Sequence, residues 1–226
     1  VLPFELESML PFEVSDAVVD YQPIDTQRGQ LRLLAAAALK TRIRDQLALF
    51  HGSPLEPREL SVGAAALDGL RALCPELNTG HHIVLSLGLH ESDFCVLENG
   101  RAAFGRTLSF GTGGASTAAL LSSIRQTLAA YRAAGAIAPT QIHVGGEGAT
   151  DEIARELGTQ TGIATALLKL PDAVDADAPL PLSFTRAAAL AGRALTTGKR
   201  INLRTGEFAS DRHRGDVASQ LQLLAV

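Results

Sequence analysis

Apolar residues fall into two kinds of pattern along the chain, and each pattern predicts one kind of element. In the middle of the chain, short and largely apolar runs at 82–88, 92–100 and 101–110 are expected to be strands. Asn99-Gly100 separates the last two runs and is the strongest short signal for a hairpin turn. We therefore expect three consecutive strands that pair as antiparallel neighbours.

After the third run, apolar residues recur every three or four positions, which is typical of amphipathic helices. The pattern predicts helices at 111–135, 149–161 and 183–197, with strands at 141–144 and 163–170 between them. The full order is β-β-β-α-β-α-β-α, and strands that are joined through helices pair in parallel by right-handed crossovers. This order indicates an α/β protein with a mixed five-stranded sheet, the ribonuclease-H-like half of an actin-like fold.

The first 80 residues show a less regular pattern. The expected elements are a helix at 4–10, strands at 17–22 and 31–37, a helix ending at Phe50, a strand at 57–63 and a helix at 64–73. The loop that follows is the best boundary. We interpret 1–80 as a remnant of a first actin-like domain with a small inserted α+β subdomain, 81–200 as the second actin-like domain, and 201–226 as a linker.

The composition narrows the range of functions. Hydrophobic residues make up 46% of the chain, enough for a packed core. The formal charge of −4 and the lack of any long Lys/Arg run argue against nucleic-acid binding. No apolar run reaches the roughly 18 residues that a transmembrane helix needs, and no signal peptide is visible. Cys74 and Cys95 form no C-x-x-C pair, which is typical of a reduced compartment.

The stretch "IHVGGEGA" at 142–149 is the first candidate for chemistry. Alternating apolar residues end there in a glycine-rich turn, and a helical pattern follows. Glycine tolerates positive φ and lets a phosphate or another backbone approach closely. Two interpretations stay open at this point, a turn that holds a nucleotide and a tight structural corner. The spacing differs from the G-x-G-x-x-G of dinucleotide sites, so the turn alone does not decide between them.

Other groups of polar residues give weaker signals. Ser86, His90 and Asp93 have the residue types of a hydrolase triad, but nothing near them resembles the G-x-S-x-G turn. An acidic cluster lacks the Gly and Glu positions of a calcium-binding loop; it consists of Asp172, Asp175 and Asp177. No histidines show H-E-x-x-H spacing. We therefore expect no catalytic residue and no metal site.

Longer stretches carry a family resemblance. "VLSLGLHESDF" (84–94) resembles the second phosphate loop of actin-like ATPases, and "IHVGGEGATDEIARELGTQTG" (142–162) resembles their adenosine loop. "LPFEVSDAVVDYQPI" (10–24) resembles the inserted subdomain of PilM, from type IV pilus systems, and of GspL, from type II secretion systems. "TRAAALAGRAL…KRINLRTGEFA" (185–209) resembles the end of the GspL cytoplasmic domain. Nearly the whole chain thus resembles the GspL/PilM branch of the actin-like ATPase superfamily.

The resemblance also shows where nucleotide chemistry would be lost. Active relatives carry an Asp two residues before the glycine of the second phosphate loop, and here Ser86 takes that position before Gly88. Glu91 and Asp93 add carboxylates, and no Lys or Arg within 84–94 offsets them. A carboxylate and a nucleotide phosphate are like charges, and at an effective dielectric of about 20 two such charges about 4 Å apart repel by about 4 kcal/mol. We therefore expect no ATP hydrolysis and no bound cofactor, although ATP is the ligand that the superfamily implies.

Four glycines occupy the nucleotide-loop positions of this resemblance. They are Gly88, Gly145, Gly146 and Gly148. We interpret them as degenerate positions that now form tight structural turns, and Glu147 between them as a solvated side chain.

The function that the resemblance implies is a non-catalytic scaffold of the type II secretion inner-membrane platform, on the cytoplasmic side of a bacterial inner membrane. Such a scaffold attaches the secretion ATPase GspE to the membrane assembly, which includes GspM, and a homodimer is compatible with this role. Both ends of the sequence read as cut, so we expect a membrane helix beyond Val226. Two alternatives stay open, a PilM-like nucleotide-binding adaptor of a type IV pilus system and an active actin-like ATPase or kinase.

The last segment, "KRINLRTGEFASDRHRGD" (199–216), has too few apolar residues for a core of its own. Such a segment either adds an edge strand to a sheet or lies as a linker. We expect Ile201 and Leu203 to cover apolar surface, and the residues after Ala209 to be mobile. Its surplus of Lys and Arg suits a position near anionic lipid.

Overall fold

The computed structural model describes residues 6–7, 10–27, 29–113, 117–172 and 178–210. These residues form two compact units. The larger, the sheet unit, consists of Ile24–Leu34 and the described residues of Gly63–Gly198. The smaller, the strap unit, consists of the described residues of Val1–Pro23, Ala35–Val62 and Lys199–Val226. The two units therefore interleave along the chain, whereas the sequence pattern predicted consecutive segments at 1–80, 81–200 and 201–226.

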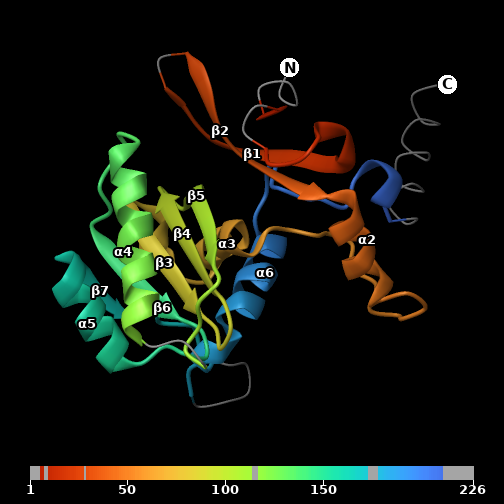
Figure 1. Cartoon of the computed structure of the whole chain (residues 1–226). Helices are drawn as coiled ribbons and strands as arrows, with labels where there is room; N and C mark the ends of the chain where they lie inside the picture. The colour runs from red at the N-terminus through yellow and green to blue at the C-terminus, as the bar shows by residue number, and fades with distance from the viewer. Residues whose placement is uncertain (1–5, 8–9, 28, 114–116, 173–177, 211–226) are drawn as a thin grey trace. The chain divides into compact units, whose positions relative to one another are not determined.

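The sheet unit is built on a five-stranded sheet with the strand order β5-β4-β3-β6-β7 (Figure 1). The strands are β3 (His81–Leu87), β4 (Ser92–Glu98), β5 (Arg101–Leu108), β6 (Gln141–Gly145) and β7 (Ala164–Leu167). β4 pairs antiparallel with β3 and with β5, whereas β6 pairs parallel with β3 and with β7. This is the mixed sheet that the order of the elements predicted, so the fold class is confirmed.

Helices cover both faces of the sheet because its central strands are apolar on both sides. In β3, Leu85 packs into the cluster that contains the buried side chains of α4 and α5, whereas Val84 packs into the cluster on the opposite face. The second cluster includes Ala188 and Ala189 of α6. The helices of the sheet unit are α3 (Gly63–Ala66), α4 (Thr117–Ala133), α5 (Asp151–Thr161) and α6 (Thr185–Leu195).

The turn between β4 and β5 has the conformation that its sequence predicts. Glu98 pairs with Arg101 across the hairpin, which leaves a two-residue loop. Both loop residues have positive φ, 49° at Asn99 and 76° at Gly100. This is the mirror-image turn whose twist matches that of paired strands.

The elements of the first 80 residues depart more from the sequence pattern. β1 (Ala17–Gln27) and β2 (Gln30–Leu39) form a two-stranded sheet, and α2 (Lys40–Ala48) follows directly, as expected. The predicted strand at 57–63 is wrong, since residues 57–62 belong to no helix or strand. The predicted helix at 64–73 splits into α3 and a 3-10 segment, η2 (Leu67–Ala72). Most of the helix expected at 4–10 lies outside the described residues, apart from two helical positions at 6–7.

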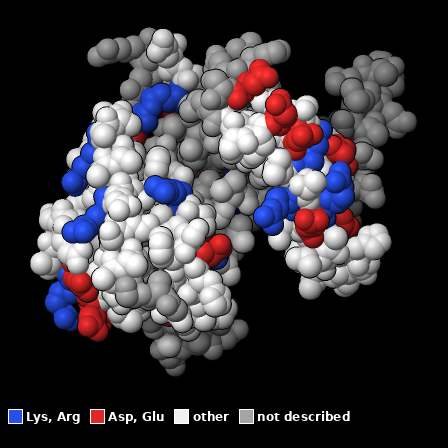
Figure 2. Space-filling view, in the orientation of Figure 1, with Lys and Arg blue, Asp and Glu red and all other residues white. Residues whose placement is uncertain are grey.

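No helix among the described residues is long and apolar enough to cross a membrane. On the face that Figure 2 shows, Lys and Arg side chains are scattered among acidic and uncharged ones. The exclusion of nucleic acid stays a prediction from the charge balance.

Two buried histidines join the central parallel strands. Nδ1 of His82, in β3, lies 3.1 Å from Nε2 of His143, in β6. Nε2 of His82 lies 2.7 Å from the carbonyl oxygen of Thr79. A carbonyl only accepts, so Nε2 of His82 carries a hydrogen and Nδ1 accepts from the N–H of His143. Burial, together with the nearby His82, lowers the pKa of His143 to about 4. His143 is therefore a neutral ring at pH 7.

This pair predicts an acid-sensitive sheet unit. In the unfolded chain this histidine binds a proton below about pH 6.5, whereas in the folded chain His143 binds it only near pH 4. The stability of the fold is therefore full above pH 6.5 and falls as the pH drops. The loss approaches about 3 kcal/mol at pH 4, from about 1.4 kcal/mol per pKa unit. Urea unfolding of the Tyr21→Phe protein, which leaves Tyr131 as the only tyrosine, measures it by fluorescence.

His143→Gln should flatten this pH dependence, whereas the matched change at the exposed His90 should not. An equal slope in the wild type and in His143→Gln would contradict the assignment.

Candidate functional site

The structure brings the four predicted glycines together at one edge of the sheet. Gly88 follows the end of β3, and Gly145 ends β6. These two strands are parallel neighbours in which Ser86 pairs with Gly145, so both loops leave the sheet side by side. The carboxyl edge of parallel strands is where α/β proteins bind ligands. The four glycines therefore lie on two loops at the same edge of the sheet.

Backbone N–H groups at this edge donate hydrogen bonds to oxygens of neighbouring segments. The N–H of Gly148 donates to the carbonyl of Leu87 over 2.9 Å. The N–H of Gly146 is shared between the carbonyl of Leu182 and Oγ1 of Thr185, each at 3.0 Å. These N–H groups belong to the turn that resembles an adenosine loop, and in this chain they bind protein oxygens.

A third loop closes on the phosphate-loop segment from the other side. The N–H of Thr112 donates to the carbonyl of Gly88 over 2.9 Å, and the N–H of Gly113 donates to the carbonyl of Leu89 over 2.8 Å. The N–H of Leu89 itself donates to Oε1 of Glu147 over 3.2 Å. Glu147 is exposed, as expected, but it was not predicted to contact the phosphate-loop segment.

Close approach explains why glycine occupies this turn. Gly146 has a φ of 94°, and a Cβ there would lie 2.3 Å from the carbonyl oxygen of Leu87. Gly145 is not among the residues with positive φ, so a tight-turn account based on its backbone would be wrong. A Cβ on Gly145 would instead lie 2.5 Å from Oγ1 of Thr185. The glycines thus allow the loops to interlock.

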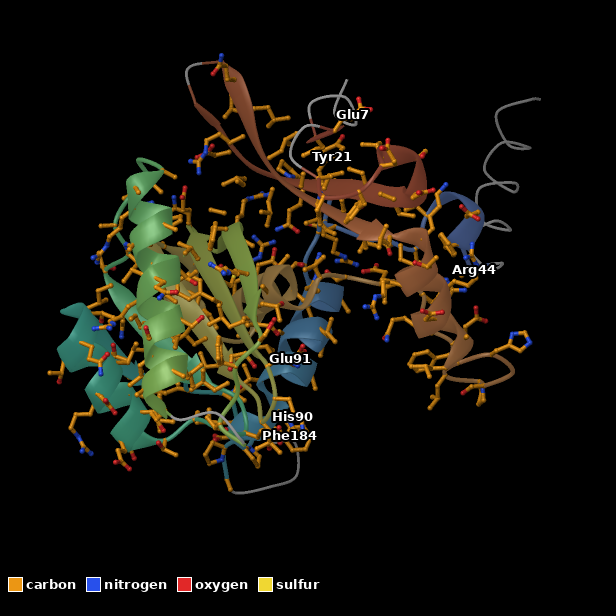
Figure 3. All side chains as sticks on the ribbon, viewed as in Figure 1. Glu7, Tyr21, Arg44, His90, Glu91 and Phe184 are labelled. Atoms are coloured by element: carbon orange, nitrogen blue, oxygen red, sulfur yellow. The ribbon has the colours of Figure 1, made fainter. Side chains whose placement is uncertain are left out.

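The acidic residues of the phosphate-loop segment are compensated, contrary to the sequence argument. Nε of Arg186, at the start of α6, lies 2.9 Å from the Asp93 carboxylate, and its Nη1 lies 3.4 Å from Glu91. Figure 3 shows Glu91 and His90 in the turn between β3 and β4. The repulsion argument was wrong in this respect, because it considered only residues 84–94. The sequence signal is that α6 carries two arginines, Arg186 and Arg193, among mostly small apolar residues, and arginines on a packed helix need acidic partners.

Asp93 is a structural carboxylate. Thr107 Oγ1 donates to Oδ1 of Asp93 over 2.7 Å, and the residue is almost fully buried. Burial raises the pKa of the Asp93 carboxyl, while the hydrogen bond from Thr107 and the charge of Arg186 act in the opposite direction. The described contacts of Asp93 are with Thr107 and Arg186, and none of them involves His90.

The remaining candidates for chemistry show no reactive arrangement in the described residues. Cys74 and Cys95 are both buried, and burial raises the pKa of the Cys74 thiol to about 11, which keeps it protonated. No group of three metal-ligating side chains gathers in the described part of the chain. Asp175 and Asp177 lie outside the described residues.

The second candidate site lies in the strap unit, where residues 199–210 form an extended segment, called the strap here. Its backbone is bound by side chains of β1. The N–H of Asn202 donates to Asp20 over 2.8 Å, and that of Ile201 donates to Oε1 of Gln22 over 3.3 Å. On its other side, the N–H of Leu203 donates to the carbonyl of Leu60 over 2.7 Å.

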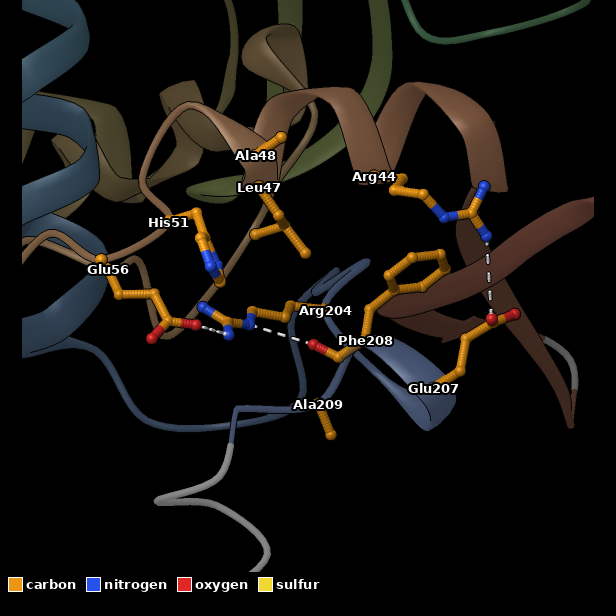
Figure 4. A pocket seen from close by; sticks show the side chains of 10 residues that line it. Arg44, Leu47, Ala48, His51, Glu56, Arg204, Glu207, Phe208 and Ala209 are labelled. Carbon is orange, nitrogen blue, oxygen red and sulfur yellow. Dashed lines mark hydrogen bonds and ion pairs between the residues drawn. The ribbon is translucent and has the colours of Figure 1, made fainter.

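Ion pairs follow the strap along its length. Arg200 Nη2 lies 2.8 Å from Glu59, and Arg204 contacts Glu56 and the carbonyl of Pro57. Glu207 pairs with Lys40 and Arg44 of α2. A pocket of about 700 Å³ lies between the end of α2 and the strap, and the buried Arg204 guanidinium and the Phe208 ring form part of its wall (Figure 4).

Two of the stretches that carry the family resemblance therefore bind each other. Asp20 and Gln22 belong to the "DYQ" stretch, and Ile201 and Leu203 belong to "NLRTGEFA" with its preceding residue. The prediction that Ile201 and Leu203 dock on the protein is confirmed, since both are buried. The strap binds without forming an edge strand. The part of the prediction that concerns residues after 210 lies outside the described residues.

Comparison with known proteins identifies the fold. No protein-family model and no curated protein matches the chain. A chain of the PilM–PilN type IV pilus biogenesis complex superposes with a TM-score of 0.71 at 19% sequence identity, covering 87% of this chain and 71% of that one. The chain has the actin-like ATPase fold.

Two further solved structures resemble the chain less. The AlfA filament from a Bacillus subtilis plasmid has a TM-score of 0.40 at 18% identity and covers 60% of this chain and 44% of that one. A Bacteroides thetaiotaomicron protein with an actin-like ATPase fold has a TM-score of 0.42 at 10% identity and covers 71% and 57%. At these identities a likeness concerns the fold. The four glycines therefore remain predicted nucleotide-loop positions.

Gly146→Ala tests the interlocked loops. We expect a loss of about 2–4 kcal/mol in the stability of the sheet unit, because both the backbone conformation and the contact with Leu87 oppose a Cβ. Gly162→Ala is the matched control, since that residue has a φ of 70° but nothing within 4 Å of its Cβ position. It should cost only about 1 kcal/mol. Equal losses in urea unfolding of the two variants would show that the crowding at Gly146 has no effect.

Ile201→Ala tests the strap. Removing this buried side chain should cost about 2–4 kcal/mol of local stability, so the amide of Leu203 should exchange with solvent faster. Hydrogen exchange followed by NMR measures this directly. Thr205→Ala, at an exposed strap position, should leave the rate unchanged. If the Leu203 amide exchanges equally in both variants, the strap is not anchored by its apolar residues.

Proposed function

We propose that this chain is a non-catalytic, PilM-like adaptor of a pilus-type assembly. In this role the actin-like body attaches a protein partner, and ATP is neither required nor hydrolysed. The observation that carries the proposal is the closed glycine-rich edge of the sheet. N–H groups of its turn bind oxygens of Leu87, Leu182 and Thr185 instead of standing open to a ligand.

The likeness to the PilM–PilN complex supports the pilus-type assignment. The superposition covers 87% of the chain and therefore takes in residues of both compact units. That complex pairs an actin-fold protein with a second protein of pilus biogenesis. By analogy, the proposed partner of this chain is a PilN-type protein.

The electrostatics of the glycine edge support a role without nucleotide. Glu91, Asp93 and Glu147 place three carboxylates around the loop after β3, and Arg186 is the cation that pairs with the first two. A nucleotide phosphate would enter a field that is formally negative, and anion sites rely on free N–H groups and positive charge. In this loop, protein oxygens already accept from the N–H groups, and carboxylates of the chain already pair with the positive charge of Arg186.

A second candidate function is the GspL-like scaffold of type II secretion. The observation that favours it is the strap, because "NLRTGEFA" is the stretch that resembles GspL and it is firmly bound to the protein. In that case the partners are GspE and GspM, and a membrane helix follows the strap. A strap bound up to Ser210 would transmit the position of that helix to the strap unit.

The test is partner binding with and without nucleotide. The chain is titrated calorimetrically with the cytoplasmic parts of PilN-, GspE- and GspM-type proteins from the same genome, in MgATP or in EDTA. We expect binding of the PilN-type partner with the same affinity in both buffers, and phosphate release at the background rate. An active actin-type ATPase serves as the positive control for the phosphate assay.

Turnover of ATP above background, or partner binding that requires MgATP, would contradict the adaptor without nucleotide. Binding of GspE and GspM in place of the PilN-type partner would establish the second candidate instead.

A further inference from the structure

The loop after β3 donates one of its backbone N–H groups to a carboxylate of the chain itself. Leu89 is the residue after Gly88, and its N–H lies 3.2 Å from Oε1 of Glu147. Backbone N–H groups in tight turns are the part of a phosphate loop that binds oxyanions. In this chain an oxyanion already lies there, and it is supplied by the turn after β6.

We infer that Glu147 is a built-in anion that closes the phosphate-loop segment and takes the place of a phosphate oxygen. The inference rests on the proposed function, since an adaptor without nucleotide needs another way to keep this loop in one conformation. It also implies that the site at Leu89 is latent, and that an inorganic oxyanion can occupy it once the carboxylate is removed.

The surrounding backbone holds Glu147 in position. Gly146 precedes it with a φ of 94°, and the N–H of Gly148 after it donates to the carbonyl of Leu87. The conformation of Gly146 and the hydrogen bond of Gly148 hold the turn against the end of β3. From this turn the Glu147 carboxylate reaches the N–H of Leu89. A Cβ at Gly148 would lie 2.3 Å from Oγ1 of Thr112, so the third loop supports the same turn.

The exposure of Glu147 distinguishes this contact from a buried structural bond. Its side chain reaches Leu89 from the solvent side, so a dissolved anion can approach the same N–H when the carboxylate is absent. Arg186 is engaged by Glu91 and Asp93, which lowers the negative field that such an anion meets. The ligand class is a small oxyanion, of which inorganic phosphate is the simplest.

The experiment measures amide hydrogen exchange of Leu89 by NMR in the whole chain. Glu147→Ala should speed exchange at Leu89 about tenfold, because a hydrogen bond to a charged acceptor is lost. Glu147→Gln keeps an acceptor without the charge and should lie between Glu147→Ala and the wild type. Glu156→Ala is the matched control, since this exposed glutamate of α5 contacts Gln160 and not the loop.

Inorganic phosphate is then added at constant ionic strength. It should slow the exchange of Leu89 in Glu147→Ala and leave the wild type unchanged, which a merely structural contact would not produce. Unchanged exchange in Glu147→Ala would overturn the closing role, and a failure of phosphate to rescue that variant would overturn the anion role. An equal phosphate effect in the wild type would show that Glu147 does not occupy the site.

The outcome is separable from the proposed function. Glu147→Ala should bind the adaptor's partner as the wild type does, so a loss of partner binding alone concerns the proposed function, and the exchange data alone concern Glu147.

Discussion

Parallel pairing of β3 with β6 is the constraint on which the candidate site depends. These strands lie next to each other in the middle of the sheet although about 60 residues separate them, and Ser86 pairs with Gly145 where they end. β3 contributes apolar side chains to the clusters on both faces of the sheet, and β6 contributes Ile142 and Val144 to one of them, so burial of these side chains stabilises the pairing. It places two glycine-rich loops within backbone hydrogen-bonding distance. Everything inferred about the loops follows from that proximity.

Once the loops are this close, glycine and hydrogen bonding decide their chemistry. A side chain at Gly146 would collide with Leu87, so the two backbones can meet only because the Cβ is missing. Their N–H groups then find carbonyl and hydroxyl partners inside the protein, which makes the edge stable without a ligand. In the proposed adaptor, these hydrogen bonds take the place of contacts to a nucleotide phosphate. The fold and the glycines are not sufficient evidence of a nucleotide site.

The strap unit uses a different kind of interaction. Backbone N–H groups of the strap are bound by the side chains of Asp20 and Gln22, and cations of the strap pair with Glu56 and Glu59. Exposed ion pairs contribute little stability by themselves, but they fix the direction and register of a segment that has no secondary structure. Ile201 and Leu203 supply the buried surface. The combination holds a polar segment in a defined path.

The sequence by itself determined the features that depend on neighbouring residues. Short apolar runs located β3, β4, β5 and β6, Asn99-Gly100 located the hairpin turn between β4 and β5, and the order of strands and helices determined a mixed five-stranded sheet. Local patterns also singled out the glycine-rich turn at 145–148 and the strap, because backbone freedom and a shortage of apolar residues are visible in a short window, whereas Gly88 was singled out by the family resemblance.

Only the tertiary structure decided which distant residues meet. Arg186 compensates Glu91 and Asp93 from a helix about 95 residues away, and Glu147 contacts Leu89 across 58 residues. In the segment at 57–63, which was predicted to be a strand, the backbone of Leu60 instead forms hydrogen bonds with the strap, about 140 residues further along. No local pattern encodes these contacts, because each depends on the close packing of elements whose positions follow from the whole sheet. The physical reason is that charge pairing and hydrogen bonding act through space, whereas periodicity records only the chain's own neighbours.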